Sequence, residues 1–113
     1  MLCYKLEIWQ TNTKLSIEFT RVISQFQAGL RDTLGVQMIN SCVELQLLIY
    51  KANKESTKVL TLEAYLEELE RLKILTRLAY EVRAISEGKL GEIVELFDSC
   101  GRQANAWRKS MLG

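Results

Sequence analysis

The chain contains no histidine and no proline, and each absence narrows what it can be. Without histidine it lacks the commonest general base and the commonest metal ligand of proteins. A di-iron site in a helical bundle uses Glu-x-x-His motifs, so that site is excluded as well. Without proline, no helix is kinked or ended by the loss of a backbone N–H. These absences disfavour an enzyme and favour long helices.

Cysteine and net charge are also scarce. Cys3, Cys42 and Cys100 form no CxxC motif, and we interpret them as buried thiols in a reducing compartment, with the cytoplasm as the expected location. No apolar run approaches the roughly 20 residues that span a membrane, and the N-terminus has no signal-peptide pattern. The net charge is +1, from 15 basic and 14 acidic residues. That balance argues against a strongly basic nucleic-acid clamp but permits a local basic patch.

What the sequence does contain is apolar residues at helical spacing. Its 113 residues, 48% of them hydrophobic, are enough for one domain with its own core. The two clearest stripes recur every three or four residues, which places each on one face of a helix. They consist of Leu62, Leu66, Leu69, Leu72, Leu75, Ala79 and Val82, and then of Leu90, Val94, Phe97, Gly101, Ala104, Trp107 and Met111.

Four stripes of this kind predict four helices, over residues 2–26, 34–52, 61–84 and 86–110. The stretch 27–33 is expected to be a loop. The expected N-caps are Asp32 or Thr33, then Thr61, then Ser86. Because the connections are short, successive helices should run antiparallel. The sequence therefore predicts an all-α protein, a single antiparallel up-down four-helix bundle over residues 1–113.

Candidate catalytic residues are few. Glu63, Glu67 and Glu70 share one helical face, but it is the face expected to meet water, so we interpret them as solvated rather than as an acid–base pair. No GxxxxGK[ST] or GxGxxG motif is present to bind nucleotide phosphates. The cysteine thiols are the only strong nucleophiles, and no histidine exists to activate them. We expect no catalytic activity, no metal and no cofactor.

Gly35, Gly101 and Trp107 are candidates for close packing or for a subunit interface. Gly101 falls inside the last predicted helix, where glycine costs about 1 kcal/mol relative to alanine, so a close helix approach is the expected compensation. Gly35 follows an expected N-cap and is a second candidate for a crowded backbone. Trp107 either shares an aromatic core layer with Trp9 or anchors an interface between subunits.

Basic residues are the best candidates for contact with a partner. If the helices alternate in direction, the ends of the second and fourth helices lie at one pole of the bundle, where their bases combine. A separate basic patch lies on the third helix. Such residues neutralise phosphates by releasing counterions, and ordinary solvation is the competing interpretation. The candidates are Lys51, Lys54 and Lys58, then Arg71, Lys73 and Arg77, and finally Arg102, Arg108 and Lys109.

Four segments carry a resemblance to a known family. They are TLGVQM at 33–38, LIYKAN at 48–53, LERLKILTRLAYEVRAIS at 69–86 and GRQANAWRKS at 101–110. Their order and spacing resemble the accessory variability determinant (Avd) proteins of diversity-generating retroelements. The related bundles encoded by intervening sequences of ribosomal RNA share a pattern like LEIWQ at 6–10, but their proline- and alanine-rich motif in the second helix is missing here.

This resemblance implies a non-catalytic subunit without a cofactor that assembles as a homo-oligomer, most simply a pentamer. Such a subunit binds the element's reverse transcriptase and template RNA and supports mutagenic cDNA synthesis. The residues that match the family's basic third helix and its C-terminal motif are Arg71, Arg77, Arg102, Trp107, Arg108 and Lys109. A net charge of +1 is low for a nucleic-acid-binding family and indicates reliance on the polymerase for RNA contact. The alternative function is a stand-alone protein-interaction bundle of the intervening-sequence type.

Overall fold

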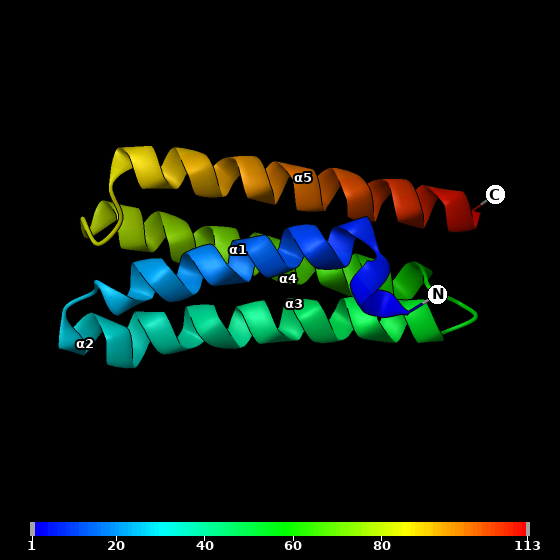
Figure 1. Cartoon of the computed structure of the whole chain (residues 1–113), viewed down its shortest axis with the longest axis horizontal. Helices are drawn as coiled ribbons and strands as arrows, with labels where there is room; N and C mark the ends of the chain where they lie inside the picture. The colour runs from blue at the N-terminus through cyan, green and yellow to red at the C-terminus, as the bar shows by residue number, and fades with distance from the viewer. Residues whose placement is uncertain (1, 113) are drawn as a thin grey trace.

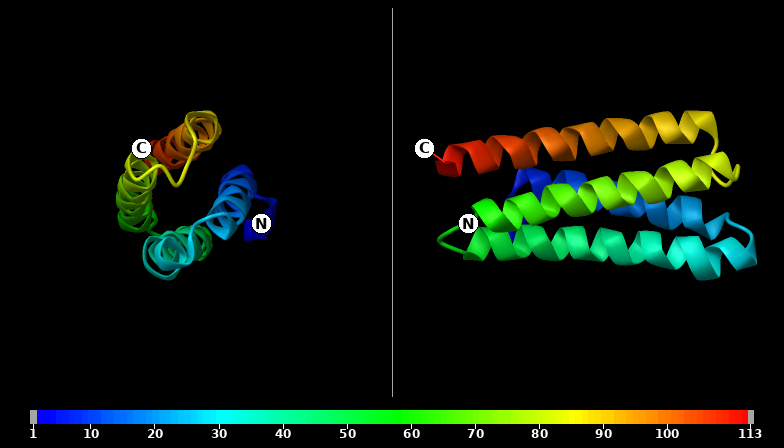
Figure 2. Two further views of the ribbon diagram at one scale, coloured as in Figure 1. Left: turned by 90° about the vertical axis from the view of Figure 1, so that its left-hand side faces the viewer. Right: turned by 180° about the vertical axis from the view of Figure 1, so that it is seen from behind.

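Four long helices form an elongated bundle in the computed structural model, which describes residues 2–112 and measures 45 × 22 × 21 Å (Figure 1). The helices are α1 (Glu7–Ser24), α3 (Val36–Lys54), α4 (Val59–Glu81) and α5 (Glu87–Leu112). Helix α1 packs against α3 and α5, and α4 packs against the same two from the opposite corner (Figure 2). Successive helices run in opposite directions, and residues 2–112 contain no strand. The predicted antiparallel four-helix bundle is confirmed.

The first two predicted helix starts are wrong. Leu6 has an extended backbone that separates a short 3-10 turn, η1 (Cys3–Lys5), from α1, so the first long helix begins at Glu7. The stretch expected to be a loop is mostly helical and forms α2 (Ala28–Leu30) and a π-helical turn, η2 (Arg31–Gly35), which leads directly into α3. Thr33 is not an N-cap, because its hydroxyl donates to the Gly29 carbonyl oxygen at 2.8 Å inside this helical segment.

The boundaries of α4 also differ from the prediction, whereas the cap of α5 agrees with it. Helix α4 begins at Val59, ahead of the expected cap Thr61, whose hydroxyl bonds the Glu55 carboxylate instead. It ends at Glu81 because Arg83 adopts a left-handed backbone (φ 63°) and the Ala84 N–H bonds back to the Ala79 carbonyl oxygen at 2.8 Å. The Ser86 hydroxyl accepts the Lys89 N–H at 3.1 Å, which confirms the predicted N-cap.

The predicted apolar stripes supply most of the core, but Val82, Val94 and Met111 were wrongly placed in them, since their side chains are exposed. Phe19 and Phe97 pair across α1 and α5 with their ring centres 5.9 Å apart. Trp9 and Trp107 are half-buried against the same core. The larger side chains that are fully enclosed come from all four long helices and include Leu15, Phe19, Met38, Leu45, Ile49, Leu62, Leu69, Leu72 and Ile93. Their burial supplies the main favourable free energy of folding.

One polar layer crosses this core and uses a residue from each long helix. The buried Asn12 of α1 accepts a hydrogen bond from the Tyr65 hydroxyl of α4 at 2.7 Å and donates to the Gln46 side-chain oxygen of α3. The Cys100 sulfur of α5 lies 4.0 Å from the same Asn12 oxygen. Because a buried polar group is costly when unpaired, this layer favours one axial register of the four helices.

The three cysteines are free, and Cys42 and Cys100 are buried. Burial raises the pKa of the Cys42 thiol to about 11 and also raises the pKa of Cys100. Both thiols therefore stay protonated at neutral pH and are weak nucleophiles. No helix within residues 2–112 is long and apolar enough to cross a membrane.

Candidate nucleic-acid and protein interface

The connection from α3 to α4, the end of α5 and both termini lie at one end of the bundle (Figure 1), and the last turns of α3 and α5 carry basic residues. The ends of α3 and α5 both lie at this pole, as their alternating directions predict, although the two helices occupy diagonal corners of the bundle. Lys51, Lys54 and Lys109 are exposed there, and within residues 2–112 none of them takes part in an ion pair. Exposed Lys5 belongs to η1, which packs against α3, and it was not among the bases predicted from the sequence. We call Lys5, Lys51, Lys54, Arg108 and Lys109 the basic pole.

Lys58 lies at this pole but serves the fold. Its ammonium donates at 2.6 Å to the carbonyl oxygens of Ala52 and Glu55, at the C-terminal end of α3, where the helix dipole favours a cation. The same ammonium lies 5.8 Å from the centre of the Trp107 ring of α5. Lys58 thus holds the end of α3 against α5, and the partner contact predicted for it stays a prediction.

Arg108 is the half-buried member of the basic pole. Its Nε atom is enclosed and has no hydrogen-bond partner among the described residues. Because this atom is enclosed, an acceptor on an outside partner cannot reach it in this conformation, and the partner contact predicted for Arg108 stays a prediction.

The three bases predicted on the third long helix have acidic neighbours within α4. Arg71, Lys73 and Arg77 pair with Glu68, Glu70 and Glu81 at 3.5, 2.9 and 2.8 Å. The Arg71 guanidinium also reaches the Gln37 side-chain oxygen of α3 at 3.5 Å. The local charge of this patch is close to zero, so it attracts a polyanion less strongly than the basic pole does.

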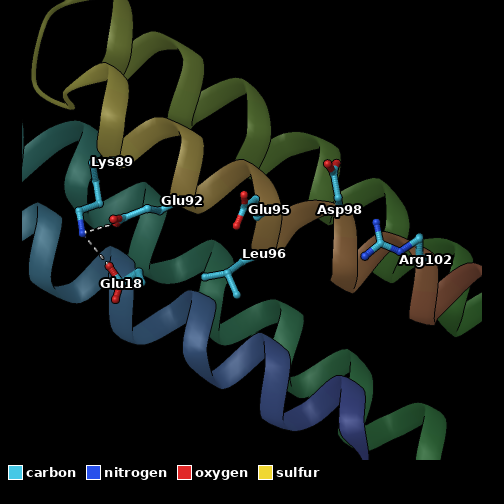
Figure 3. Close-up of a pocket in the computed structure, with 7 residues that line it drawn as sticks. All are labelled: Glu18, Lys89, Glu92, Glu95, Leu96, Asp98 and Arg102. Atoms are coloured by element: carbon cyan, nitrogen blue, oxygen red, sulfur yellow. Dashed lines mark hydrogen bonds and ion pairs between the residues drawn. The ribbon is translucent and has the colours of Figure 1, made fainter.

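Arg102 lies in a recess between α1 and α5 rather than at the basic pole (Figure 3). The recess has a volume of about 800 Å³ and is open to solvent. Lys89 bridges Glu18 and Glu92 across it at 3.1 and 2.7 Å, and these hydrogen bonds raise the pKa of Lys89. Its lining consists of Glu18, Lys89, Glu92, Glu95, Leu96, Asp98 and Arg102. With four carboxylates against two bases, this surface does not suit a nucleic acid.

The two glycines singled out in the sequence have different surroundings. Gly35 is buried, and a Cβ atom added there would come within 2.8 Å of Ile23 Cγ2, so α1 and the start of α3 approach too closely for a side chain. A Cβ atom at Gly101 would lie 3.8 Å from Leu69 Cδ2, which is an ordinary contact. The close helix approach expected at Gly101 is therefore not what requires glycine there.

The fold and the charge distribution together are typical of a helical binding protein. The chain is a helical bundle with bases at one end, paired charges along α4 and weakly nucleophilic thiols in its core. Within residues 2–112, no group of three acidic or thiol side chains is placed to hold a metal ion. Such a scaffold offers surfaces for binding.

The particular family follows from a comparison with protein-family models. The model described as bAvd-like matches residues 8–111, so this chain belongs to the bAvd-like family. The resemblance to Avd proteins of diversity-generating retroelements is thereby confirmed. A comparison with curated proteins finds no match.

Proposed function

We propose that this protein is a non-catalytic accessory subunit of a diversity-generating retroelement. In this role it binds the reverse transcriptase of the element and its template RNA in the cytoplasm and supports mutagenic cDNA synthesis. It acts as a homo-oligomer, with a pentamer favoured. Membership of the bAvd-like family is the observation that carries the proposal.

The basic pole supports the RNA contact. Lys51 and Lys54 lie in the last turn of α3 and Lys109 in the last turn of α5, and these two helices end at the same pole, whereas the bases on α4 are paired with carboxylates. In a ring of identical subunits, this pole repeats around the symmetry axis and becomes a continuous electropositive belt. A chain with a net charge of +1 can therefore still present a concentrated positive field to RNA.

Two triple variants test which surface meets RNA. Lys51→Gln, Lys54→Gln and Lys109→Gln together remove three charges from the basic pole. Arg71→Gln, Lys73→Gln and Arg77→Gln remove the same number from the α4 patch and serve as the matched control. We expect the first variant to weaken binding of a fluorescent template RNA about tenfold and to flatten its salt dependence, because each lost phosphate contact lowers the slope by roughly 0.7. Equal losses in both variants would contradict the assignment of the basic pole.

Co-purification and light scattering test the partner and the assembly. We expect a mass near five copies of the 13.0 kDa chain, and a further increase when the element's reverse transcriptase is added. A 13.0 kDa monomer that does not capture the enzyme would overturn the proposal. An oligomer that captures no reverse transcriptase would favour a stand-alone interaction bundle of the intervening-sequence type.

A further inference from the structure

The turn between α4 and α5 carries an arginine at a position where helix ends favour glycine. Arg83 follows the end of α4 with a left-handed backbone (φ 63°). The Arg83 N–H donates to the Tyr80 carbonyl oxygen at 2.9 Å, and the Ala84 N–H donates to the Ala79 carbonyl oxygen at 2.8 Å. These two bonds form a Schellman motif, whose left-handed position is usually glycine and sometimes asparagine. Arginine is unfavourable there because its Cβ atom crowds the backbone.

The packing on both sides of the turn fixes this backbone conformation. Ala79 is buried before the turn, and Ile85 enters the core only two residues after Arg83. The next residue, Ser86, accepts the Lys89 N–H and begins α5. Because both ends are anchored, the left-handed conformation is required of whichever residue occupies position 83. Glycine would meet this requirement at a lower conformational cost.

The Arg83 side chain has no compensating contact in the fold. It is exposed, and within residues 2–112 its guanidinium takes part in no hydrogen bond or ion pair. The neighbouring Arg77, in contrast, pairs with Glu81 at 2.8 Å and lies 5.3 Å from the centre of the Tyr80 ring. The dipole of α4 favours a cation near its end, but a base inside the last turn would supply that charge without a left-handed backbone. An unfavourable residue without a structural benefit points to a function.

The surroundings of Arg83 indicate what it can bind. The side chain borders a recess of about 430 Å³, lined by Tyr80, Glu81, Arg83, Ile85, Ser86 and Glu87. Two carboxylates at this recess repel a polyanion such as RNA. Close by at the end of α4, Leu78 and Val82 are 51% and 55% exposed. One free guanidinium beside apolar side chains complements a single carboxylate with apolar neighbours, a combination that proteins offer and RNA does not.

We propose that Arg83 pairs with a carboxylate of the element's reverse transcriptase, with Leu78 and Val82 in the surrounding contact. This inference rests on the proposed function and assigns the enzyme's contact to the turn between α4 and α5. A guanidinium can hold both oxygens of one carboxylate, which makes arginine the preferred base for such a pair. The turn lies at the end of the bundle opposite the connection from α3 to α4 (Figure 1). Enzyme and RNA can then occupy opposite ends of one subunit.

Binding of the immobilised reverse transcriptase to variants of the full chain tests the assignment. Arg83→Gln removes the charge, and Arg83→Gly also suits the left-handed backbone. Arg31→Gln is the matched control, because Arg31 is exposed, has no ion pair within residues 2–112 and follows α2 at the same end of the bundle. We expect both Arg83 variants to bind the enzyme about tenfold more weakly and Arg31→Gln to bind as the wild type does. Arg83→Gly should keep its affinity for template RNA and should not lower the thermal midpoint.

The outcomes separate this inference from the proposed function. If the wild type binds the enzyme and Arg83→Gly binds it equally well, the inference is overturned and the proposed function stands. Equal losses in Arg31→Gln would overturn the inference, because the charge of this end alone would explain them. A lower thermal midpoint of Arg83→Gly would assign the arginine to the fold, and a loss confined to RNA would assign it to the nucleic acid. Each of these two results also overturns the inference, whereas a wild type that binds no enzyme overturns both proposals.

Discussion

The buried polar layer gives the sharpest prediction about what fixes this bundle. Asn12 is fully buried, and its side-chain oxygen accepts the Tyr65 hydroxyl at 2.7 Å. Replacing Tyr65 by Phe leaves that oxygen without its strongest donor, and replacing Asn12 by Leu leaves the Tyr65 hydroxyl without an acceptor. Each change should lower the free energy of unfolding by about 1–3 kcal/mol, the usual cost of one buried polar group left unpaired.

The combination of the two changes distinguishes a network from two independent contacts. In Asn12→Leu with Tyr65→Phe, both partners become apolar at similar volume, so little remains unsatisfied between them. Gln46 is half-buried, so water can replace its lost donor. We expect the double variant to be less destabilised than the sum of the single variants, with a coupling of about 1–2 kcal/mol.

Urea unfolding followed by circular dichroism at 222 nm measures these differences. All variants must be compared at one protomer concentration, because self-association would otherwise change the apparent stability. Thr20→Ala, which removes an exposed hydroxyl that donates to the Ser16 carbonyl oxygen of its own helix at 2.9 Å, is the control and should cost less than about 0.5 kcal/mol. Additive losses in the double variant, or a Tyr65→Phe loss as small as the control, would refute the reasoning.

Other predictions concern titration, glycine and the α3 cap. The Cys42 thiol has a pKa of about 11 when folded and 9.0 when exposed, so the unfolded chain loses its proton first. The free energy of unfolding should therefore fall as the pH rises from 9 to 11, and this thiol should account for about 1 kcal/mol of the loss at pH 10. Cys42→Ala should remove this contribution, which urea unfolding at pH 9 and at pH 11 would measure. Gly35→Ala should lower the free energy of unfolding by about 1–3 kcal/mol and lower the thermal midpoint, because the added methyl group clashes with Ile23. Gly101→Ala should raise the free energy of unfolding by roughly 0.5–1 kcal/mol and raise the thermal midpoint. The opposite order of the two glycine variants would contradict the packing described here. Lys58→Met should loosen the end of α3, measured as faster amide hydrogen exchange over its last turn, and unchanged exchange would show that the carbonyls are capped without it.

Much of the fold could be predicted because helical periodicity is a local property. Leu62, Leu69 and Leu72 mark a buried face whatever their partners are, and the long stripes contained no proline to interrupt them. The N-cap at Ser86 was predictable for the same reason, since it depends on neighbours three residues away. Boundaries were predicted less well. The stretch 27–33 was predicted to be a loop, yet most of it is helical in the structure, as α2 and the first part of η2.

The candidate site was harder to predict from the sequence, because it depends on contacts that form only in the tertiary structure. The sequence identified which residues are basic, and the alternation of helices placed the ends of α3 and α5 together. It could not reveal that Lys58 caps α3, that Arg71, Lys73 and Arg77 are paired with acids, or that Arg102 shares a recess with four carboxylates. These facts depend on side-chain partners brought together by folding, and charge alone does not specify a partner.

By itself, the sequence determined the helical class, the antiparallel order of the helices and the family resemblance. Each of these follows from the spacing of nearby residues, from short connections or from sequence motifs. Only the tertiary structure decided which face of α3 is covered and which is left bare. Both faces carry apolar residues at helical spacing, so the pattern in the sequence is the same kind of signal for each. Burial is a property of what lies opposite a side chain, and the bundle places Leu45 against the other helices while leaving Val43 and Leu47 facing outward.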